Sequence, residues 1–274
     1  MKHTYDVIIR NFFRLLCCGV LQEEDALEPM SLYKWRILFS WVCNKRVENV
    51  MKSGFETYEK HQSPCITSDV LSLYHESITA NGDNVMQLSE MRFSNIWLNR
   101  KLKRIRAIER KKEAPASETL NVLNIIIYSF VMALNHGLSF NALLCLAKYI
   151  RMNENCIDYV LLKKWLAKLN LDKFAQLQGS ILVSFFHFDQ SELPFVKKVD
   201  TAASQLVLKS LPVAEPIEEK NVKFWQGKLG FVHNNSKILR HSLYYTLSFA
   251  HYSPLEAFSN YVHNIALSLA NLEE

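Results

Sequence analysis

The chain has 274 residues, of which 49% are hydrophobic and 22% charged, and its formal net charge is +5. These proportions are ordinary for a soluble globular protein, and seven glycines and seven prolines are too few for a disordered chain or a turn-rich all-β fold. No pattern typical of a signal peptide opens the sequence, and the most apolar stretch, 122–134, is too short to span a bilayer. We therefore expect a cytoplasmic protein without a transmembrane segment.

The six cysteines give no sign of a metal site or a disulfide framework. None belongs to a Cys-x-x-Cys pair, and no histidine follows them at the spacing of a zinc site. Cys17 and Cys18 lie side by side in an apolar run, where free cysteines act as small buried hydrophobic residues. We expect no cofactor, and the sequence does not indicate which small-molecule ligand, if any, the protein binds.

Helical periodicity dominates the chain, and the alternation typical of strands is rare. Gly19 is suited to ending the first helix, and Pro194 to beginning a later one. The stretch 120–134 is apolar almost all round, which is typical of a helix at the centre of a bundle. Helices are predicted over about 5–18, 32–42, 45–60, 88–113, 120–134, 139–151, 158–169, then one that ends at about 188, one from 194, and two at 235–250 and 254–271. A short element is expected at 224–231.

This pattern predicts an all-α fold, an irregular multi-helix bundle with no substantial β-sheet. A turn is expected at 81–84, and the proline-containing stretch 211–216 is the best candidate for a linker. We predict a helical bundle over 1–210, which includes the helix at about 88–113. The rest, 211–274, is predicted to be a linker and a C-terminal helical extension that packs on the same bundle.

Four apolar stretches carry a resemblance to a known family. They are FFRLLCCGV at 12–20, LEPMSLYKWRILFSWVCNKRV at 27–47, LNVLNIIIYSFVMALNHGLSFNALLCLA at 120–147 and IDYVLLKKWLAKLNLDKF at 157–174. Together they resemble the helical regions that flank the catalytic core of a bacterial, still uncharacterised nucleotidyltransferase family. The resemblance implies a core between them whose Gly-Asp-x-Asp carboxylates hold two divalent cations.

The chain departs from that family where the chemistry is expected. The interval at about 65–115 is short for the core, its Gly82-Asp83 is followed by Asn84, and no two aspartates are two residues apart. Glu23 and Asp25 have that spacing but lie in a predicted loop, where carboxylates are usually solvated. Where the family tends to place histidines, an arginine and an aspartate, this chain has Tyr128, Met132, Asn141 and Cys145.

One segment, 100–112, concentrates positive charge. It holds eight basic residues against Glu109, and without it the chain has 24 basic and 26 acidic residues, which turns the net charge from +5 to −2. Leu98, Leu102 and Ile105 are spaced to form an apolar seam on one side of a helix. The candidate binding residues are Trp97, Arg100, Lys101, Lys103, Arg104, Arg106, Arg110, Lys111 and Lys112.

Three interpretations of this segment stay open. The cations could bind backbone phosphates of RNA or DNA, with an affinity that depends on salt. They could instead dock on an acidic protein or lipid surface. The segment could also be a solvated helix that takes the place of the missing core. Arg104, Arg106 and Arg110 are predicted to point away from the seam, so that reversing their charges leaves folding intact.

The sequence favours a non-catalytic binding or adaptor module that engages nucleic acid or a protein partner through 97–112. The rival hypothesis is an enzyme: a divergent nucleotidyltransferase, or one whose partner supplies the metal-binding carboxylates. A strand-rich metal-binding fold within 65–115 would favour the rival, and an uninterrupted basic helix would oppose it. A third possibility is a degenerate protein without a retained molecular role.

Overall fold

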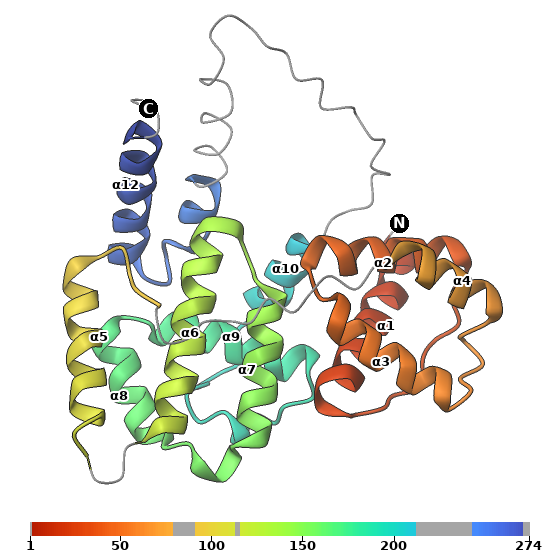
Figure 1. Cartoon of the computed structure of the whole chain (residues 1–274), viewed down its shortest axis with the longest axis horizontal. Coiled ribbons are helices and arrows are strands. Elements are labelled where there is room, and N and C mark those ends of the chain that lie inside the picture. The colour runs from red at the N-terminus through yellow and green to blue at the C-terminus, as the bar shows by residue number, and fades with distance from the viewer. Residues whose placement is uncertain (1, 79–90, 113–115, 212–242, 271–274) are drawn as a thin grey trace, which may run out of the picture. The chain divides into compact units, whose positions relative to one another are not determined.

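The computed structural model describes residues 2–78, 91–112, 116–211 and 243–270 (Figure 1). Within these ranges the regular structure is entirely helical, which confirms the predicted all-α multi-helix fold. The predicted turn at 81–84, the short element at 224–231 and all of the predicted linker except Leu211 lie outside the described residues.

The contacts between residues divide the chain into two compact units. Unit 1 comprises 1–87, 140–157 and 178–212, and unit 2 comprises 88–139, 158–177 and 213–274. This division differs from the predicted limits of 1–210 and 211–274, because each unit collects segments that are far apart in the sequence. Helix α9 (Asp172–Phe185) contributes its first six residues to unit 2 and the rest to unit 1.

Unit 1 is built around the first helix of the chain. Helix α1 (Lys2–Leu21) packs against α3 (Glu48–Lys60), α7 (Phe140–Met152) and α2 (Leu32–Lys45), and α2 also packs against α4 (Ser68–Ser77). The unit is completed by α10 (Thr201–Ser210) and the short turns η2 (Glu154–Cys156) and η3 (Gln190–Glu192). Its core is rich in aromatic rings, such as those of Phe12 and Trp41, which meet edge to face at 6.0 Å.

The sequence suggested that Gly19 ends the first helix, but it does not. Helix α1 continues to Leu21, and Gly19 lies against the backbone of α3 at Val50 and Gly54. A Cβ atom on Gly19 would overlap the carbonyl oxygen of Val50, and one on Gly54 would overlap that of Leu15. The two glycines therefore let the backbones of α1 and α3 cross in direct contact.

Cys17 and Cys18 are buried on α1, as predicted. Burial, which disfavours the charged thiolate, raises the pKa of Cys17 to about 12, and it also raises the pKa of Cys18. Both thiols are therefore uncharged at neutral pH and fill space in the core.

The helix predicted to start at Pro194 starts later, at Thr201. Residues 190–192 form η3, where Asp189 and Glu192 make a capping box, and the next helix begins at Thr201. The side chain of Asp200 accepts a hydrogen bond from the Ala202 N–H at 2.8 Å, and this cap fixes the start of α10. Pro194 was the weaker signal, because the first turn of a helix merely tolerates proline. Asp200, by contrast, accepts a hydrogen bond from one of the free backbone N–H groups at the helix start.

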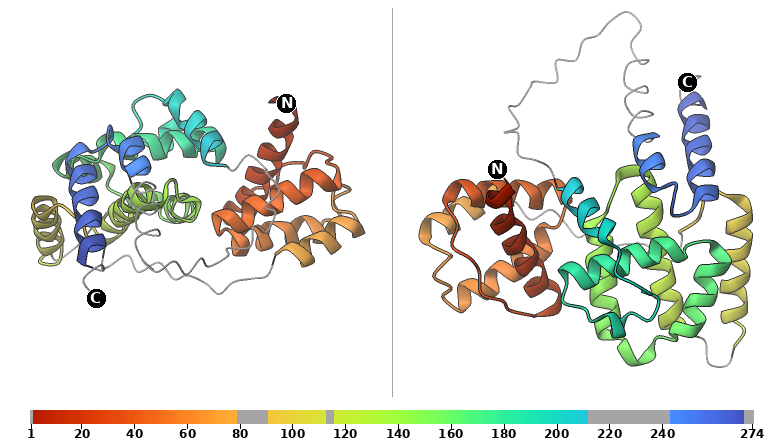
Figure 2. Two further views of the ribbon diagram at one scale, coloured as in Figure 1. Left: turned by 90° about the horizontal axis from the view of Figure 1, so that it is seen from above. Right: turned by 180° about the vertical axis from the view of Figure 1, so that it is seen from behind.

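Unit 2 surrounds helix α6 (Ser117–His136), whose stretch 120–134 is largely buried, as predicted for a central helix. Helix α8 (Tyr159–Leu169) packs against both α6 and α5 (Ile96–Glu109), and both figures show α5 and α8 side by side (Figures 1 and 2). A helical segment at 243–249 and helix α12 (Pro254–Ala270) complete the unit.

Helix α6 is the one helix among the described residues that is long and apolar enough to cross a membrane by length and composition. In the structure, 61% of its most apolar window is buried by other parts of the protein. Core helices of globular proteins pass the same test, so this is weak evidence for a membrane span.

Candidate nucleic-acid interface

Helix α5 carries the basic segment singled out in the sequence, and its first turn is firmly capped. Oδ1 of Asn95 accepts hydrogen bonds from the N–H groups of Trp97 and Leu98, each at 3.0 Å. The helix is shorter than the predicted 88–113, since residues 91–95 are not helical. Residues 88–90 and 113 lie outside the described part of the chain.

The predicted apolar seam fixes which side of α5 faces the protein. Leu98, Leu102 and Ile105 are each exposed by 2% or less, so the seam is buried as expected. Because successive residues of an α-helix are turned by about 100°, residues 96, 97, 100, 103, 104 and 107 fall on the opposite side, with 108 at its edge. This outward face of α5 is where a ligand could reach the helix.

Three of the predicted binding cations make contacts within unit 2: Lys101, Arg106 and Lys112, the last of which pairs with Glu109. Lys101 donates through Nζ to the backbone carbonyl of Lys168 at the end of α8, at 3.0 Å. Arg106 is half-buried, and its guanidinium donates to Oδ1 of the buried Asn124 at 2.7 Å and to the carbonyl of Met91 at 3.2 Å. The contacts of Lys101 and Arg106 hold α5 against α8 and α6.

The position of Arg106 corrects one sequence expectation. Its side chain is bound to Asn124 and Met91 instead of pointing freely away from the seam, so we expect charge reversal there to destabilise the fold. Burial lowers the pKa of the Arg106 guanidinium, with a further contribution from the like charges of Arg110 and Arg92. Arg106 is therefore a residue that positions α5 in the fold, whereas Arg104 and Arg110 are exposed.

The remaining candidates are exposed. Trp97 has 69% of its surface exposed, and Arg100, Lys103 and Arg104 share the outward face with it. Arg110, Lys111 and Lys112 follow directly after the last turn of the helix and are also exposed. Ile96 and Ile108 are exposed on the outward face as well, so the face mixes cations with large apolar side chains.

The one acidic residue of this helix, Glu109, is paired with one of the candidate cations. Glu109 is buried, and its carboxylate binds the ammonium of Lys112 at 2.5 Å and accepts from the Ala116 N–H at 3.3 Å. No other carboxylate occurs between 91 and 112. The outward face of α5 therefore presents cations without a neighbouring negative charge of its own helix.

Glu256 on α12 is a second buried carboxylate, which the sequence reasoning did not single out. Its two oxygens accept hydrogen bonds from the N–H groups of Ser94 and Asn95, at 2.6 and 3.0 Å. Ser259 accepts from the Asn95 amide at 2.9 Å, and Asn260 accepts from the Ser94 hydroxyl at 3.2 Å. These bonds fasten α12 to the start of α5.

The environment of Glu256 disfavours its negative charge. Burial raises the pKa of Glu256 to about 7, although the hydrogen bonds from Ser94 and Asn95 act in the opposite direction. A sequence signal for this residue exists, because Glu256 is the only Lys, Arg, Asp or Glu between 243 and 270. A lone charge in such a segment is typical of a residue with a specific partner.

Glu23 and Asp25, the two carboxylates with the spacing of a metal pair, contact Arg151 and His187 in unit 1. Arg151 Nη2 lies 3.2 Å from Glu23, and the imidazole of His187 lies 3.3 Å from Glu23 and 3.4 Å from Asp25. No group of three or more His, Cys, Asp or Glu residues within the described ranges is arranged to hold a metal ion. These side chains instead join the loop after α1 to the segment around His187.

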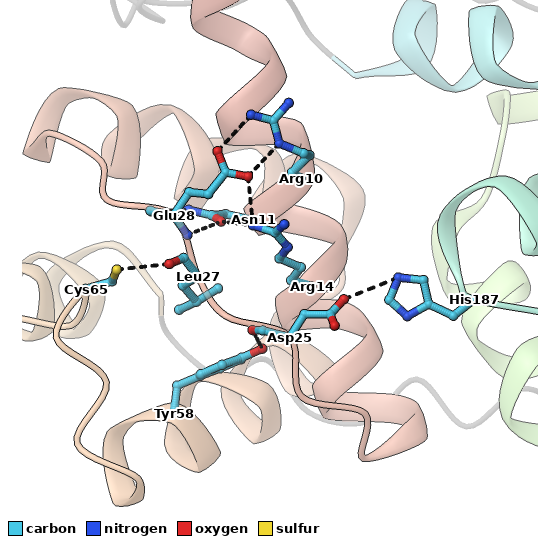
Figure 3. A network of polar contacts seen from close by, with 9 residues as sticks. All are labelled: Arg10, Asn11, Arg14, Asp25, Leu27, Glu28, Tyr58, Cys65 and His187. Carbon is cyan, nitrogen blue, oxygen red and sulfur yellow. Dashed lines mark hydrogen bonds and ion pairs between the residues drawn. The ribbon is translucent and has the colours of Figure 1, made fainter.

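The same loop is fixed to α1 by a polar network around Glu28 (Figure 3). The Glu28 carboxylate is held by Arg10, at 2.6 and 2.8 Å, and by Arg14, at 2.9 Å. The hydrogen bond from Arg10 is the largest of the effects that lower the pKa of Glu28 to about 2. Asn11 binds the backbone N–H and carbonyl of Glu28, so this cluster is satisfied internally.

Comparison with known proteins adds no relative. No family model, curated protein or solved structure matches the chain. The resemblance to the nucleotidyltransferase family therefore stays a prediction. Of the positions compared with that family, Asn141 donates to the Arg46 carbonyl at 2.6 Å within unit 1, whereas Tyr128 and Met132 belong to unit 2.

Proposed function

We propose that this protein is a non-catalytic helical module that binds nucleic acid through the outward face of α5. The observation that carries the proposal is the exposed Trp97 on the same face as Arg100, Lys103 and Arg104. Cations attract the phosphate backbone and release its counterions. An exposed aromatic ring offers a surface on which an unpaired base can stack.

This combination favours single-stranded nucleic acid. Bases of a duplex are already stacked on one another, whereas those of a single strand are free to lie on Trp97 while the phosphates reach the cations. Arg110 and Lys111 would extend the track of cations past the end of the helix, whereas Lys112 is paired with Glu109. The described residues offer no pattern that reads particular bases, so the binding we propose is independent of sequence.

A second candidate function is the binding of an acidic protein partner. It is favoured by Ile96 and Ile108, which are exposed beside the cations and would contribute little to nucleic-acid binding. A partner surface with carboxylates around an apolar centre would match both kinds of side chain.

The alternative activity, nucleotide transfer, requires carboxylates that hold divalent cations. Within 65–115 the described residues form α4 and α5 and no strand. The carboxylate of α5, Glu109, is buried and ion-paired with Lys112. The binding role is therefore the one supported by the exposed residues. As part of the proposal, the chain keeps the helical scaffold of the nucleotidyltransferase family and works in the cytoplasm, where its free cysteines stay reduced.

Fluorescence anisotropy with labelled 20-nucleotide RNA and DNA tests the proposal. The double variant R100E/R104E should weaken binding by more than about tenfold, because it replaces two attractive charges with repulsive ones. The matched control is K163E/K164E, which makes the same change in net charge on the exposed side of α8. Binding equal in both variants, or no binding of the wild type at low salt, would contradict the proposal.

A further inference from the structure

The end of the described chain is almost free of charge. Between 243 and 270 Glu256 is the only Lys, Arg, Asp or Glu, although such residues make up 22% of the chain. Glu256 is buried against the start of α5, so it places no charge on the surface. Over 243–266 the outer surface therefore carries no Lys, Arg, Asp or Glu, and its titratable side chains besides tyrosines are His251 and His263.

Helix α12 exposes a stripe of large apolar side chains along this segment. Leu255, Phe258 and Val262 are spaced by three and four residues, which places them on one side of the helix. Phe258 has 70% of its surface exposed. The other side of α12 carries the buried Glu256 and Asn260, so α12 is anchored on one side and apolar on the other.

The helical segment 243–249, which precedes α12 in the chain, exposes two more large apolar side chains. Tyr244 and Leu247, three residues apart on 243–249, are also exposed. We define the apolar surface as Tyr244, Leu247, Leu255, Phe258 and Val262. From their exposed fractions, these five side chains together leave about 600 Å² open to water, a total comparable to the largest apolar patch of a typical monomer.

We propose that the apolar surface binds the same surface of a second copy of this chain. In a dimer with two-fold symmetry each residue meets its own counterpart or one close to it, so any charge near the axis would face a like charge. A surface without charges avoids this repulsion. A different partner could have been recognised by opposite charges, which this surface does not offer.

The available area suits such a dimer. A standard interface buries about 800 Å² on each partner, and the five side chains supply about three quarters of that before any polar rim is counted. Phe258 is the most exposed of them and stands in the middle of the α12 stripe, so it is the expected anchor of the interface. The inference rests on α12 and does not depend on the nucleic-acid proposal for α5.

The test is the mass of the full chain in solution, measured by light scattering and by sedimentation equilibrium at about 1 to 100 µM. Wild type is expected to be a dimer within this range, and Phe258→Glu should raise the dissociation constant by more than about tenfold. The matched control is Val160→Glu, which places the same charge on an equally exposed apolar residue of α8 and should leave the dimer intact.

Several results would overturn the inference: a monomeric wild type at the highest concentration, an assembly larger than a dimer, or equal dissociation constants for Phe258→Glu and the wild type. A monomer that binds vesicles of anionic lipid would assign the surface to a membrane instead. Circular dichroism melting of each variant confirms folding, and Phe258→Ser, which adds no charge, replaces Phe258→Glu if the latter fails to fold.

Discussion

The first turn of α12 is hydrogen-bonded to the residues just before α5, yet the outward surfaces of these two helices differ in chemistry. That of α5 carries Arg100, Lys103 and Arg104 around Trp97, and that of α12 carries apolar side chains and no charge. The buried sides of both helices are fixed by polar contacts, through Arg106 on α5 and Glu256 on α12. Similar anchoring thus supports two surfaces, which we assign to different partners.

The same comparison separates the cations within α5. Arg104 and Arg106 are two residues apart, but one is exposed and the other bonds to Asn124 on α6. A segment with high positive charge can therefore contain both ligand-binding and structural residues. A variant in which all cations of the segment are replaced together could not distinguish a loss of binding from a loss of stability.

The largest expected effect distinguishes these two arginines. Arg106→Glu would bring a carboxylate against the oxygens of Asn124 and Met91, and it should lower the free energy of unfolding by about 3 to 4 kcal/mol. Arg104→Glu should change it by less than about 0.5 kcal/mol, as is usual for exposed positions. Urea denaturation followed by circular dichroism measures both, and equal effects would refute the structural role of Arg106.

The next prediction concerns the anchor of α12. The pKa of Glu256 in the folded protein, about 7, is above the value of 4.5 for a free carboxyl group. Between these values the folded state binds the extra proton, so stability is fully present below pH 4.5 and falls as the pH rises to about 7. The difference corresponds to about 3 kcal/mol.

Denaturation at several pH values between 4.5 and 7 tests this anchor. Glu256→Gln cannot ionise and should lose this fall in stability. A variant with the same pH dependence as the wild type would show that another group is responsible.

Glu28 of unit 1 gives a smaller effect of the opposite sign. Its pKa is lowered to about 2 by Arg10, so its contribution is present above pH 4.5 and is lost as the pH falls towards 2. Arg10→Gln should reduce the loss of stability in that acidic window and leave the window from 4.5 to 7 unchanged. Acid denaturation monitored by circular dichroism distinguishes the two carboxylates.

A further prediction compares the two surfaces directly, with variants at exposed positions that should leave the stability of the fold unchanged. R100E/R104E should lose nucleic-acid binding and remain a dimer, whereas Phe258→Glu should become monomeric and bind nucleic acid with an affinity changed by less than about threefold. Anisotropy and light scattering are measured on the same preparations. Loss of both properties in either variant would mean that the two surfaces act together.

The sequence predicted local features of α5 and α12 well, and long-range ones poorly. The spacing of Leu98, Leu102 and Ile105 predicted the buried seam because it depends on helix geometry alone. The roles of Arg106 and Glu256 depend on Asn124 and Asn95, which lie 18 and 161 residues away and are brought close only by the fold. No periodic pattern carries that information.

The errors in the predicted helix boundaries have a similar origin. Gly19 could either end a helix or allow a close crossing, and the choice depends on Gly54 of another helix. Asp200 is a helix-capping residue that could have predicted the start of α10, but the prediction relied on Pro194 and placed the start too early. Local signals thus predicted most of the helices, although not α4, while competing signals of similar strength decided their ends.

The most direct test of the central claim is the salt dependence of RNA binding by the variant R100A/R104A. If each arginine contacts a phosphate of a single strand, the slope of log K against log salt concentration should decrease by about 1.4 in magnitude relative to the wild type. The control K163A/K164A should keep the wild-type slope. The same slope in all three proteins would contradict the assignment of the outward face of α5 as the nucleic-acid interface.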